Sequence, residues 1–438
     1  METTEISKTA IPKEVSDAAV NFVGSFSKEL DKLPHRIAGS EEETACARMI
    51  RSRLHSETDA DVRLEAFRAT PSLGRGVFPM FGVWFLLSYL IYYLTFIGNR
   101  LSGILVTLFA ALFFLTGVGI ILAIYYGDRR LKGLLKKKIS YNVVSEFSKN
   151  KSSDVKDRVI VIADNHDLKH GSILKDYGTL RKLALLATPV AAALFVIFCI
   201  LKMAIGTEEP YLSAKITLFV IIPAVPGVFG TASAFMHYSP FARHAKRGNG
   251  VSTCLAMATY SYFAEQPDLL PDDVKIVYAS FGSENAGHDG SQAFKAAHPK
   301  FLNAYVLCIG DIAGNDIKLA EANPFGKKQF STQMTLDISS ATHDIGMTLT
   351  TVPHRTLSQK LENVHGFMSA AFAESGIHST TLIGCGDGKP DEEDISKLFS
   401  LTVGTVFNLF KSVPPIADDN KDQPPIASGM EIKSVTVK

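Results

Sequence analysis

The chain has few cysteines, and none of them forms a paired motif. Five cysteines occur in 438 residues, at wide spacing, and no C-x-x-C is among them. Structural zinc fingers need closely spaced cysteine pairs. This scarcity argues against a structural zinc finger and suits a reducing compartment.

The chain also lacks a large net charge, a secretory leader and the G-x-S-x-G motif of serine hydrolases. The 45 Lys and Arg residues and the 44 Asp and Glu residues leave a charge of +1, so overall charge indicates no polyionic partner such as a nucleic acid. Residues 1–40 are polar, without a basic segment followed by an apolar one, and we expect no secretory signal there. No G-x-S-x-G occurs, which argues against serine hydrolysis.

Long apolar runs, by contrast, are abundant. The chain is 46% hydrophobic, and the excess lies in four runs, at 77–98, 101–126, 183–206 and 216–236. Each run is long enough to cross a hydrocarbon core about 30 Å thick as a helix. Buried core helices are the alternative, which four such runs disfavour. We therefore expect two transmembrane helical hairpins, at 77–126 and 183–236.

Basic residues flank these hairpins on one side. They precede the first and third runs and follow the second and fourth: Arg68, Arg75, Arg129, Arg130, Lys132, Lys136, Lys137, Lys138, Arg181, Lys182, Arg243, Lys246 and Arg247. Such a bias marks the cytoplasmic side of a membrane. We expect a multi-pass protein of the cell membrane with its soluble domain and both termini in the cytoplasm. The run 129–138 suits anionic headgroups better than a nucleic acid.

Outside the apolar runs, helical and strand patterns alternate. Helical spacing occurs at 14–33, 41–54, 251–266, 356–375 and 394–411, and strand patterns occur at 60–69, 139–146, 158–164, 273–281, 303–310 and 380–383. This alternation predicts an α/β fold. No single soluble stretch forms a complete domain, so we expect one discontinuous domain made of 1–76, 127–182 and 237–412. The charged, proline-rich tail at 413–438 is predicted to be disordered.

The stretch from Phe281 to Ser291 reads F-G-S-E-N-A-G-H-D-G-S and follows an apolar run at 274–280. A strand followed by Glu284 and a turn on Gly287 and Gly290 places a carboxylate at the carboxyl edge of a sheet. Open α/β sheets bind their ligands at that edge. The stretch is therefore the first candidate for a functional site.

This stretch resembles the signature of the co-catalytic zinc exopeptidases of the aminopeptidase Y and leucine aminopeptidase type. Weaker matches follow in the family's order: His35–Ser40 with Glu42 for R-x-x-G-S-x-x-E, Asn142-Val-Val for N-V-x, 159–167 for the strand that ends in H-x-D, Asp311–Gly314 for D-x-x-G, and Glu374–Ile377 before the last ligand. Some membrane-bound relatives carry hydrophobic hairpins in the same loops. The resemblance implies a phosphorylase/hydrolase-like sheet sandwiched by helices and a zinc-dependent peptide hydrolase.

The resemblance also implies five zinc ligands and one general base. Carried onto this chain, the first histidine falls at Asn165, the bridging aspartate at Asn249, the glutamate at Asn285 and the second aspartate at Asp311. The element with the last histidine is missing after residue 384. Glu284 keeps the position of the general base.

Four of the five ligand positions are therefore lost. Asparagine is a weak, uncharged oxygen donor, and one carboxylate with neutral amides cannot hold two zinc ions. We expect a pseudoenzyme without a cofactor, which binds a peptide or protein in the former substrate cleft or acts as an accessory module. A transporter or channel accessory built on the hairpins is a further alternative.

An active zinc aminopeptidase that hydrolyses N-terminal peptide bonds at the membrane also stays open. It would use Glu284 as the base and Asp311 as a ligand. It would need substitute ligands from nearby side chains that otherwise suit loops and surfaces: His166, Asp167, His170, His288, Asp289, His343 and Asp344. The structural alternative for Glu284 is a carboxylate that accepts N–H groups at the strand end. Asp311 could cap a helix in the same way.

Overall fold

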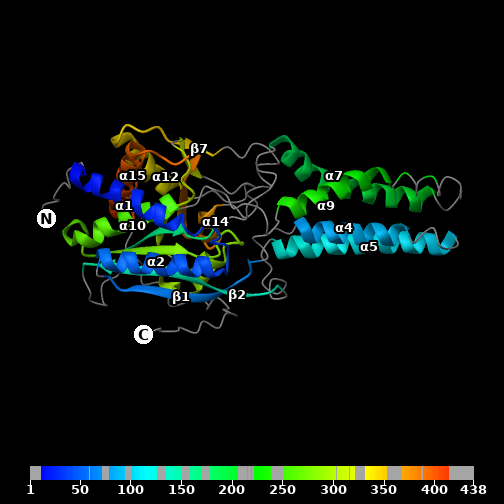
Figure 1. Ribbon diagram of the computed structural model, residues 1–438, viewed down its shortest axis with the longest axis horizontal. Coiled ribbons are helices and arrows are strands. Elements are labelled where there is room, and N and C mark those ends of the chain that lie inside the picture. The colour runs from blue at the N-terminus through cyan, green and yellow to red at the C-terminus, as the bar shows by residue number, and fades with distance from the viewer. Residues whose placement is uncertain are drawn as a thin grey trace.

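Figure 1 shows an α/β body and a bundle of four helices that extends from one end of it. We analysed a computed structural model, which describes residues 11–58, 60–71, 78–93, 100–125, 135–149, 158–168, 178–205, 215, 219, 221–237, 250–301, 303–314, 316–320, 331–352, 367–385 and 388–413.

One mixed sheet of eight strands forms the centre of the body, in the order β1-β2-β4-β3-β5-β8-β6-β7. The strands are β1 Val62–Ala69, β2 Lys138–Ser148, β3 Arg158–Asn165, β4 Val274–Phe281, β5 Tyr305–Ile309, β6 Asp316–Ala320, β7 Thr350–Thr351 and β8 His378–Cys385. The four central strands β4, β3, β5 and β8 run parallel, so their carboxyl ends meet at one edge. Antiparallel β1 and β2 extend the sheet on one side.

Helices cover both faces of the sheet, which explains why β3 and β4 are apolar on both faces. One face carries α1 Lys13–Leu30, α2 Glu41–Thr58, α10 Gly250–Glu265, α12 Thr332–Asp344 and α15 Glu392–Ser412. The other face carries α11 Asp289–Ala297 and α14 Met368–Ala373. The larger core packs Ile160 and Ile162 of β3 under α10, and the smaller core packs Val161 and Ala163 against Phe294 and Phe372.

The bundle consists of α4 Phe78–Tyr93, α5 Arg100–Tyr125, α7 Gly178–Ile205 and α9 Ile221–His237. Each helix packs on two others, with α4 between α5 and α9 and α7 completing the ring. Aromatic rings fill the centre, where Phe195 meets Phe85, Tyr89 and Phe114 at centroid distances of 5.3–5.9 Å. The bundle thus has its own core, separate from that of the body.

Small residues let α4 and α9 approach closely. A Cβ added at Gly82 would lie 2.6 Å from Thr231 Cγ2, and one added at Gly227 would overlap the ring of Phe85. Thr231 Oγ1 donates to the Gly227 carbonyl over 2.7 Å. Contacts of this small-residue type are enriched between membrane helices.

The outside of the bundle is apolar. Large apolar side chains that are exposed in the described residues lie mostly on these four helices: Val83, Leu86, Leu87, Leu90, Leu105, Leu108, Phe109, Leu112, Leu115, Ile120, Leu183, Leu186, Val190, Ile197, Ile200, Leu201, Ile221, Ile222, Val225, Val228 and Phe229. One helical window in the described residues, Gly103–Ile120, is long and apolar enough to cross a membrane, and 82–93 and 189–204 are shorter apolar helices. The mixed α/β sheet is confirmed, whereas the two transmembrane hairpins stay a prediction.

Strands from all three stretches outside the apolar runs join this one sheet. The expected strands and the helices at 14–33, 41–54, 251–266 and 394–411 are present with shifted ends. Of the helix expected at 356–375, the described part is helical only at 368–373, and 353–366 lie outside the described residues. The elements β6, β7 and α12 were not predicted. The tail from 414 also lies outside the described residues.

Candidate functional site

Three chain segments leave the sheet together at its carboxyl edge. Asn165 pairs with Phe281, and Asp164 pairs with Ile309, so β3, β4 and β5 end side by side. The segments that follow these strands are 166–168, 282–288 and 310–314. They bring most of the described site residues predicted from the sequence to one edge.

The turn after β4 has an unusual backbone. Ser283 and His288 adopt left-handed conformations with φ of 52° and 61°, and Gly287 has φ of 97°. The Asn142 side chain on β2 spans this turn, because its Oδ1 accepts from Gly282 N over 3.2 Å and its Nδ2 donates to Gly290 O over 2.9 Å. The Asn142-Val-Val match therefore marks a residue that shapes the site turn.

Glu284 is held by the first turn of α11. Its side chain is 4% exposed. Glu284 Oε2 accepts from Ser291 N over 3.0 Å, and Oε1 lies 3.0 Å from Ser291 Oγ and 2.6 Å from His288 Nδ1. A carboxylate at a helix N-terminus meets unpaired N–H groups and a favourable dipole. These contacts suit the structural role that the sequence left open for Glu284.

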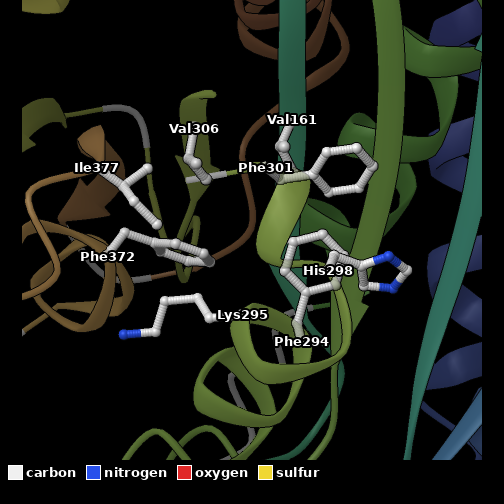
Figure 2. Close-up of a pocket in the computed structure, with 8 residues that line it drawn as sticks. All are labelled: Val161, Phe294, Lys295, His298, Phe301, Val306, Phe372 and Ile377. Carbon is white, nitrogen blue, oxygen red and sulfur yellow. The ribbon is translucent and has the colours of Figure 1, made fainter. Parts of the chain in front are cut away.

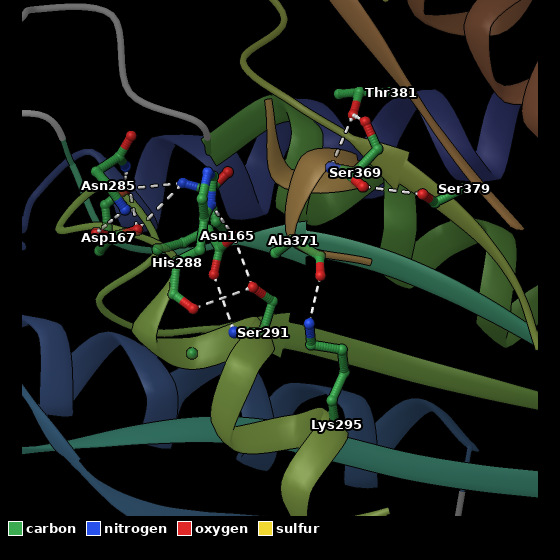
Figure 3. Close-up of polar contacts among 12 residues, drawn as sticks. Asn165, Asp167, Asn285, His288, Ser291, Lys295, Ser369, Ala371, Ser379 and Thr381 are labelled. Atoms are coloured by element: carbon green, nitrogen blue, oxygen red, sulfur yellow. Dashed lines mark hydrogen bonds and ion pairs between the residues drawn. The ribbon is translucent and has the colours of Figure 1, made fainter. Parts of the chain in front are cut away.

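Asp167 collects the side-chain amides of two predicted ligand positions. Asn165 Nδ2 lies 3.2 Å from Asp167 Oδ1, and Asn285 Nδ2 lies 3.1 Å from the same atom. Asn285 N also donates to Asp167 Oδ2 over 2.9 Å. Figure 3 shows the two amides converging on this carboxylate, beside His288 and Ser291. We call Asn165, Asp167 and Asn285 the amide–aspartate cluster.

Burial dominates the electrostatics of this cluster. Asp167 is 1% exposed, and burial raises its pKa to about 7, with a further rise from the Glu284 charge against hydrogen bonds from Asn285 and Asn165. A carboxyl group with such a pKa takes up a proton near neutrality. The cluster therefore changes its charge within the physiological range.

Asp311 is placed differently from the cluster. It follows β5, its side chain is exposed, and its carbonyl accepts from Gly384 N over 2.9 Å. Among the described residues, its carboxylate makes no hydrogen bond or ion pair with the amide–aspartate cluster or with Glu284. Asn249 and His170 fall outside the described residues. The described part of the chain holds no group of three His, Cys, Asp or Glu side chains that could bind a metal ion.

The other substitute ligands have separate roles or positions. His343 and Asp344 are exposed at the end of α12, and Asp289 Oδ2 accepts from Thr70 N over 2.6 Å. His166 is fully buried, and its Nδ1 lies 3.0 Å from Ser280 Oγ. Burial and the charge of Arg36 lower the pKa of His166 to about 3. This imidazole is therefore neutral and belongs to the interior.

The Ser280 hydroxyl also donates to Asp164 Oδ1 over 2.7 Å, and Thr253 Oγ1 donates to the same atom over 3.0 Å. The serine thus stands between the histidine and the aspartate, with all three side chains at 0% exposure. A catalytic triad needs the histidine in the middle and an accessible serine. This network is therefore structural.

Glu43 is a site residue that the sequence interpretation missed. The R-x-x-G-S-x-x-E match was assigned to Glu42, but Glu42 is partly exposed and caps His35 N. Glu43 is 1% exposed and accepts from Ser283 N over 2.7 Å, from Ser140 Oγ over 2.9 Å and from Gly39 N over 2.6 Å. Counting three residues on from the capping Ser40 would have found it.

Glu43, like Asp167, therefore holds the turn that carries Glu284. Burial raises the pKa of Glu43 to about 8, and the charge of Asp167 adds to the rise. The two carboxyl groups hold consecutive parts of one turn, at Ser283 N and Asn285 N. Their protonation is linked because each charge disfavours the other.

Arg36 is a second missed residue, and it is 1% exposed. Its Nε donates to the His166 carbonyl over 3.1 Å, while its own carbonyl accepts from Leu168 N over 2.6 Å. The buried guanidinium thus joins the α1–α2 connection to the segment after β3. That segment carries Asp167, so Arg36 helps to position the cluster.

A small recess lies on the other helical face, under α11 and α14. Figure 2 shows its lining of Val161, Phe294, Lys295, His298, Phe301, Val306, Phe372 and Ile377. The Lys295 ammonium donates to the Ala371 carbonyl and to Ser375 Oγ. With its surface otherwise apolar and aromatic, the recess offers few polar groups to orient a ligand.

No family model and no curated protein sequence matches the chain. Solved structures with a similar course of the backbone include BSAP, a zinc aminopeptidase from Bacillus subtilis (12% identity, TM-score 0.47, 90% of this chain and 94% of that one). An aminopeptidase from Aneurinibacillus sp. strain AM-1 has 11% identity to this chain and a TM-score of 0.44, and the match covers 90% of this chain and 93% of that one. The glutaminyl cyclase of Fimbriiglobus ruber has 11% identity and a TM-score of 0.44, and the match covers 89% of this chain and 95% of that one. At these identities and TM-scores, the likeness carries no conclusion about activity.

Proposed function

We propose that this chain is a membrane-anchored protein with a zinc-aminopeptidase-like fold that has lost metal-dependent catalysis and binds a peptide or protein at the carboxyl edge of its sheet. The observation that carries the proposal is the amide–aspartate cluster. Asn165 and Asn285, at two of the ligand positions that the resemblance implies, turn their amide nitrogens toward Asp167.

The donor chemistry of the cluster does not fit two zinc ions. An amide N–H is a hydrogen-bond donor and cannot ligate a cation, and these donors occupy the Asp167 oxygen that a metal would use. Glu284 is engaged by His288 and Ser291 in the same way. Hydrogen bonds within the protein thus replace the electrostatic role that a metal pair would have in the family.

A binding role suits the polar side chains that reach the surface at this edge. Asp311 is exposed, and Asn285 and His288 are partly exposed. These side chains offer hydrogen-bond acceptors and donors suited to a polypeptide backbone.

Membrane anchoring is supported by the outside of the bundle. Leu90, Leu112 and Val225 lie on three of its helices and are 63%, 53% and 69% exposed. Contiguous apolar surface of this extent marks a membrane or a protein interface. The basic flanks of the hairpins favour the cytoplasmic membrane, with the body and both termini in the cytoplasm.

Metal content tests the loss of catalysis. The full chain would be purified in detergent, incubated with zinc, desalted and analysed by mass spectrometry. We expect no stoichiometric zinc. About two zinc ions per chain would overturn the proposal.

An active metallo-aminopeptidase is the second candidate, favoured by the retained Glu284 and by the exposure of Asp311. Peptidase activity of the purified chain that is abolished in Glu284→Gln, while the variant keeps its thermal stability, would establish it. Activity that is the same in the variant would be a contaminant.

A further inference from the structure

The described residues just before β2 and at its start form an exposed basic segment. Lys136, Lys137 and Lys138 are exposed, and the next residue, Ile139, is 60% exposed. Outside the bundle, few large apolar side chains of the described residues are exposed to this degree. An exposed isoleucine directly after three lysines therefore needs a physical reason.

The register of the sheet adds a fourth cation. Arg68 on β1 pairs with Ile139, and Ala69 pairs with Lys138. Directly opposite residues of an antiparallel pair share one face, and Arg68 is exposed. The isoleucine is thus flanked by cations along its own strand and across the sheet. We call Arg68, Lys136, Lys137, Lys138 and Ile139 the base patch.

The cations of the base patch differ from those at the far end of the same strands. There, Glu146 pairs with Arg63, with Lys275 over 3.6 Å and with Lys300 over 3.6 Å. Among the described residues, no carboxylate forms an ion pair with a cation of the base patch. Among the described residues, ion pairs therefore balance the charges at one end of β1 and β2 but not those at the other end.

The location of the patch suggests what balances these charges. The base patch lies where β1 ends and β2 begins, and Figure 1 shows the bundle beside that end of the two strands. If the bundle spans a bilayer, as proposed above, the patch lies at the level of the lipid headgroups. Clusters of Lys and Arg beside a membrane helix attract anionic lipids, and an apolar side chain among them can enter the interface.

We propose that the base patch binds the phosphate groups of anionic phospholipids, with Ile139 inserted into the headgroup layer. The inference rests on the proposed membrane anchor and goes beyond it, because an apolar bundle alone does not distinguish anionic from neutral lipids. It assigns the four cations a ligand, and it assigns the exposed isoleucine an environment.

The test places the full chain in nanodiscs of phosphatidylcholine, with and without phosphatidylglycerol, and measures hydrogen exchange at residues 135–142. We expect phosphatidylglycerol to slow this exchange, and high salt to reverse part of the effect. Replacing Lys136, Lys137 and Lys138 with glutamine should weaken the response to phosphatidylglycerol by about tenfold or more. Ile139→Ser should reduce protection in both lipids.

A matched control removes three cations at the end of the body away from the bundle. Lys13, Lys149 and Lys300 are exposed there, and their glutamine variant should respond to phosphatidylglycerol as the unchanged chain does. An equal response in both triple variants would overturn the base patch. Slower hydrogen exchange at residues 135–142 caused by an acidic peptide in the absence of anionic lipid would also overturn the proposal. A chain that stays soluble without detergent and outside the nanodiscs would overturn the membrane anchor instead, and the patch with it.

Discussion

The backbone N–H of Thr70 donates to Asp289 Oδ2 over 2.6 Å in a buried hydrogen bond. Asp289 begins α11, directly after the turn that carries Glu284, and Thr70 lies just ahead of the first apolar run. The bond therefore ties the entrance of the bundle to the candidate site.

Asp289→Ala should destabilise the body. The substitution leaves the buried Thr70 N–H without its acceptor, which costs about 1–3 kcal/mol. Thermal unfolding in detergent, monitored by circular dichroism, would measure the loss. Asp268→Ala is the matched control, because the Asp268 side chain is fully exposed. Equal unfolding temperatures for the two variants would contradict the importance of this bond.

Stability should fall as pH rises from about 5 to 8. Burial raises the pKa of Glu43 to about 8 and the pKa of Asp167 to about 7, above the ordinary values of 4.5 and 3.8 for these side chains. The folded state thus holds more protons than the unfolded state in this window, so ΔG of unfolding decreases with pH. The decrease is of the order of a few kcal/mol.

Glu43→Gln tests how much Glu43 contributes to the dependence of stability on pH. Glutamine carries no charge at any pH between 5 and 8, so the stability of the variant should depend less steeply on pH, although its overall stability is lower. Chemical unfolding at several pH values would give the slope. An unchanged slope in the variant would show that Glu43 does not titrate in this range.

Asn285→Asp should be most harmful at alkaline pH. The change removes the amide that donates to Asp167 and places a second carboxylate beside it. Like charges at this distance disfavour joint ionisation, and the lost hydrogen bond costs about 1 kcal/mol more. When unfolding is measured at both pH 8 and pH 5.5, the unfolding temperature of the variant should drop more at pH 8. A drop that is equal at both values would contradict the role of the amide–aspartate cluster.

Gly82→Leu should separate α4 from α9. Its side chain would overlap Thr231, since even a Cβ lies 2.6 Å from Thr231 Cγ2. Overpacking of this kind costs about 1–3 kcal/mol. Gly119→Leu on α5 is the matched control, because a Cβ there meets no atom within 4 Å. Cross-linking of cysteine pairs across α4 and α9 should fail in the first variant and persist in the second.

The sheet was largely predictable from the sequence because its buried strands are continuous apolar runs. Residues 158–165 and 274–281 show this pattern most clearly. The short edge strand 350–351 and the helix 332–344 were missed, since neither carries a strong apolar period. Sequence patterns cannot show that the strand is held by pairing with β6 and the helix by packing on α15 and β8.

The candidate site was predictable in position but only partly in its contacts. The F-G-S-E motif located the turn, and the asparagines at 165 and 285 were identified as unusual. Their convergence on Asp167 depends on the pairing of β3 with β4, which no local pattern encodes. Glu43 and Arg36 reach the site from a distant helix connection, so their burial follows from tertiary packing alone.

The pairing of Ala69 with Lys138 has a consequence for how this architecture can vary. The two strands that flank the first apolar segment are already antiparallel neighbours, and a tight turn of a few residues can join such strands. The segment between them is therefore modular: it can be lengthened, exchanged or replaced by a short turn without changing the register of the sheet.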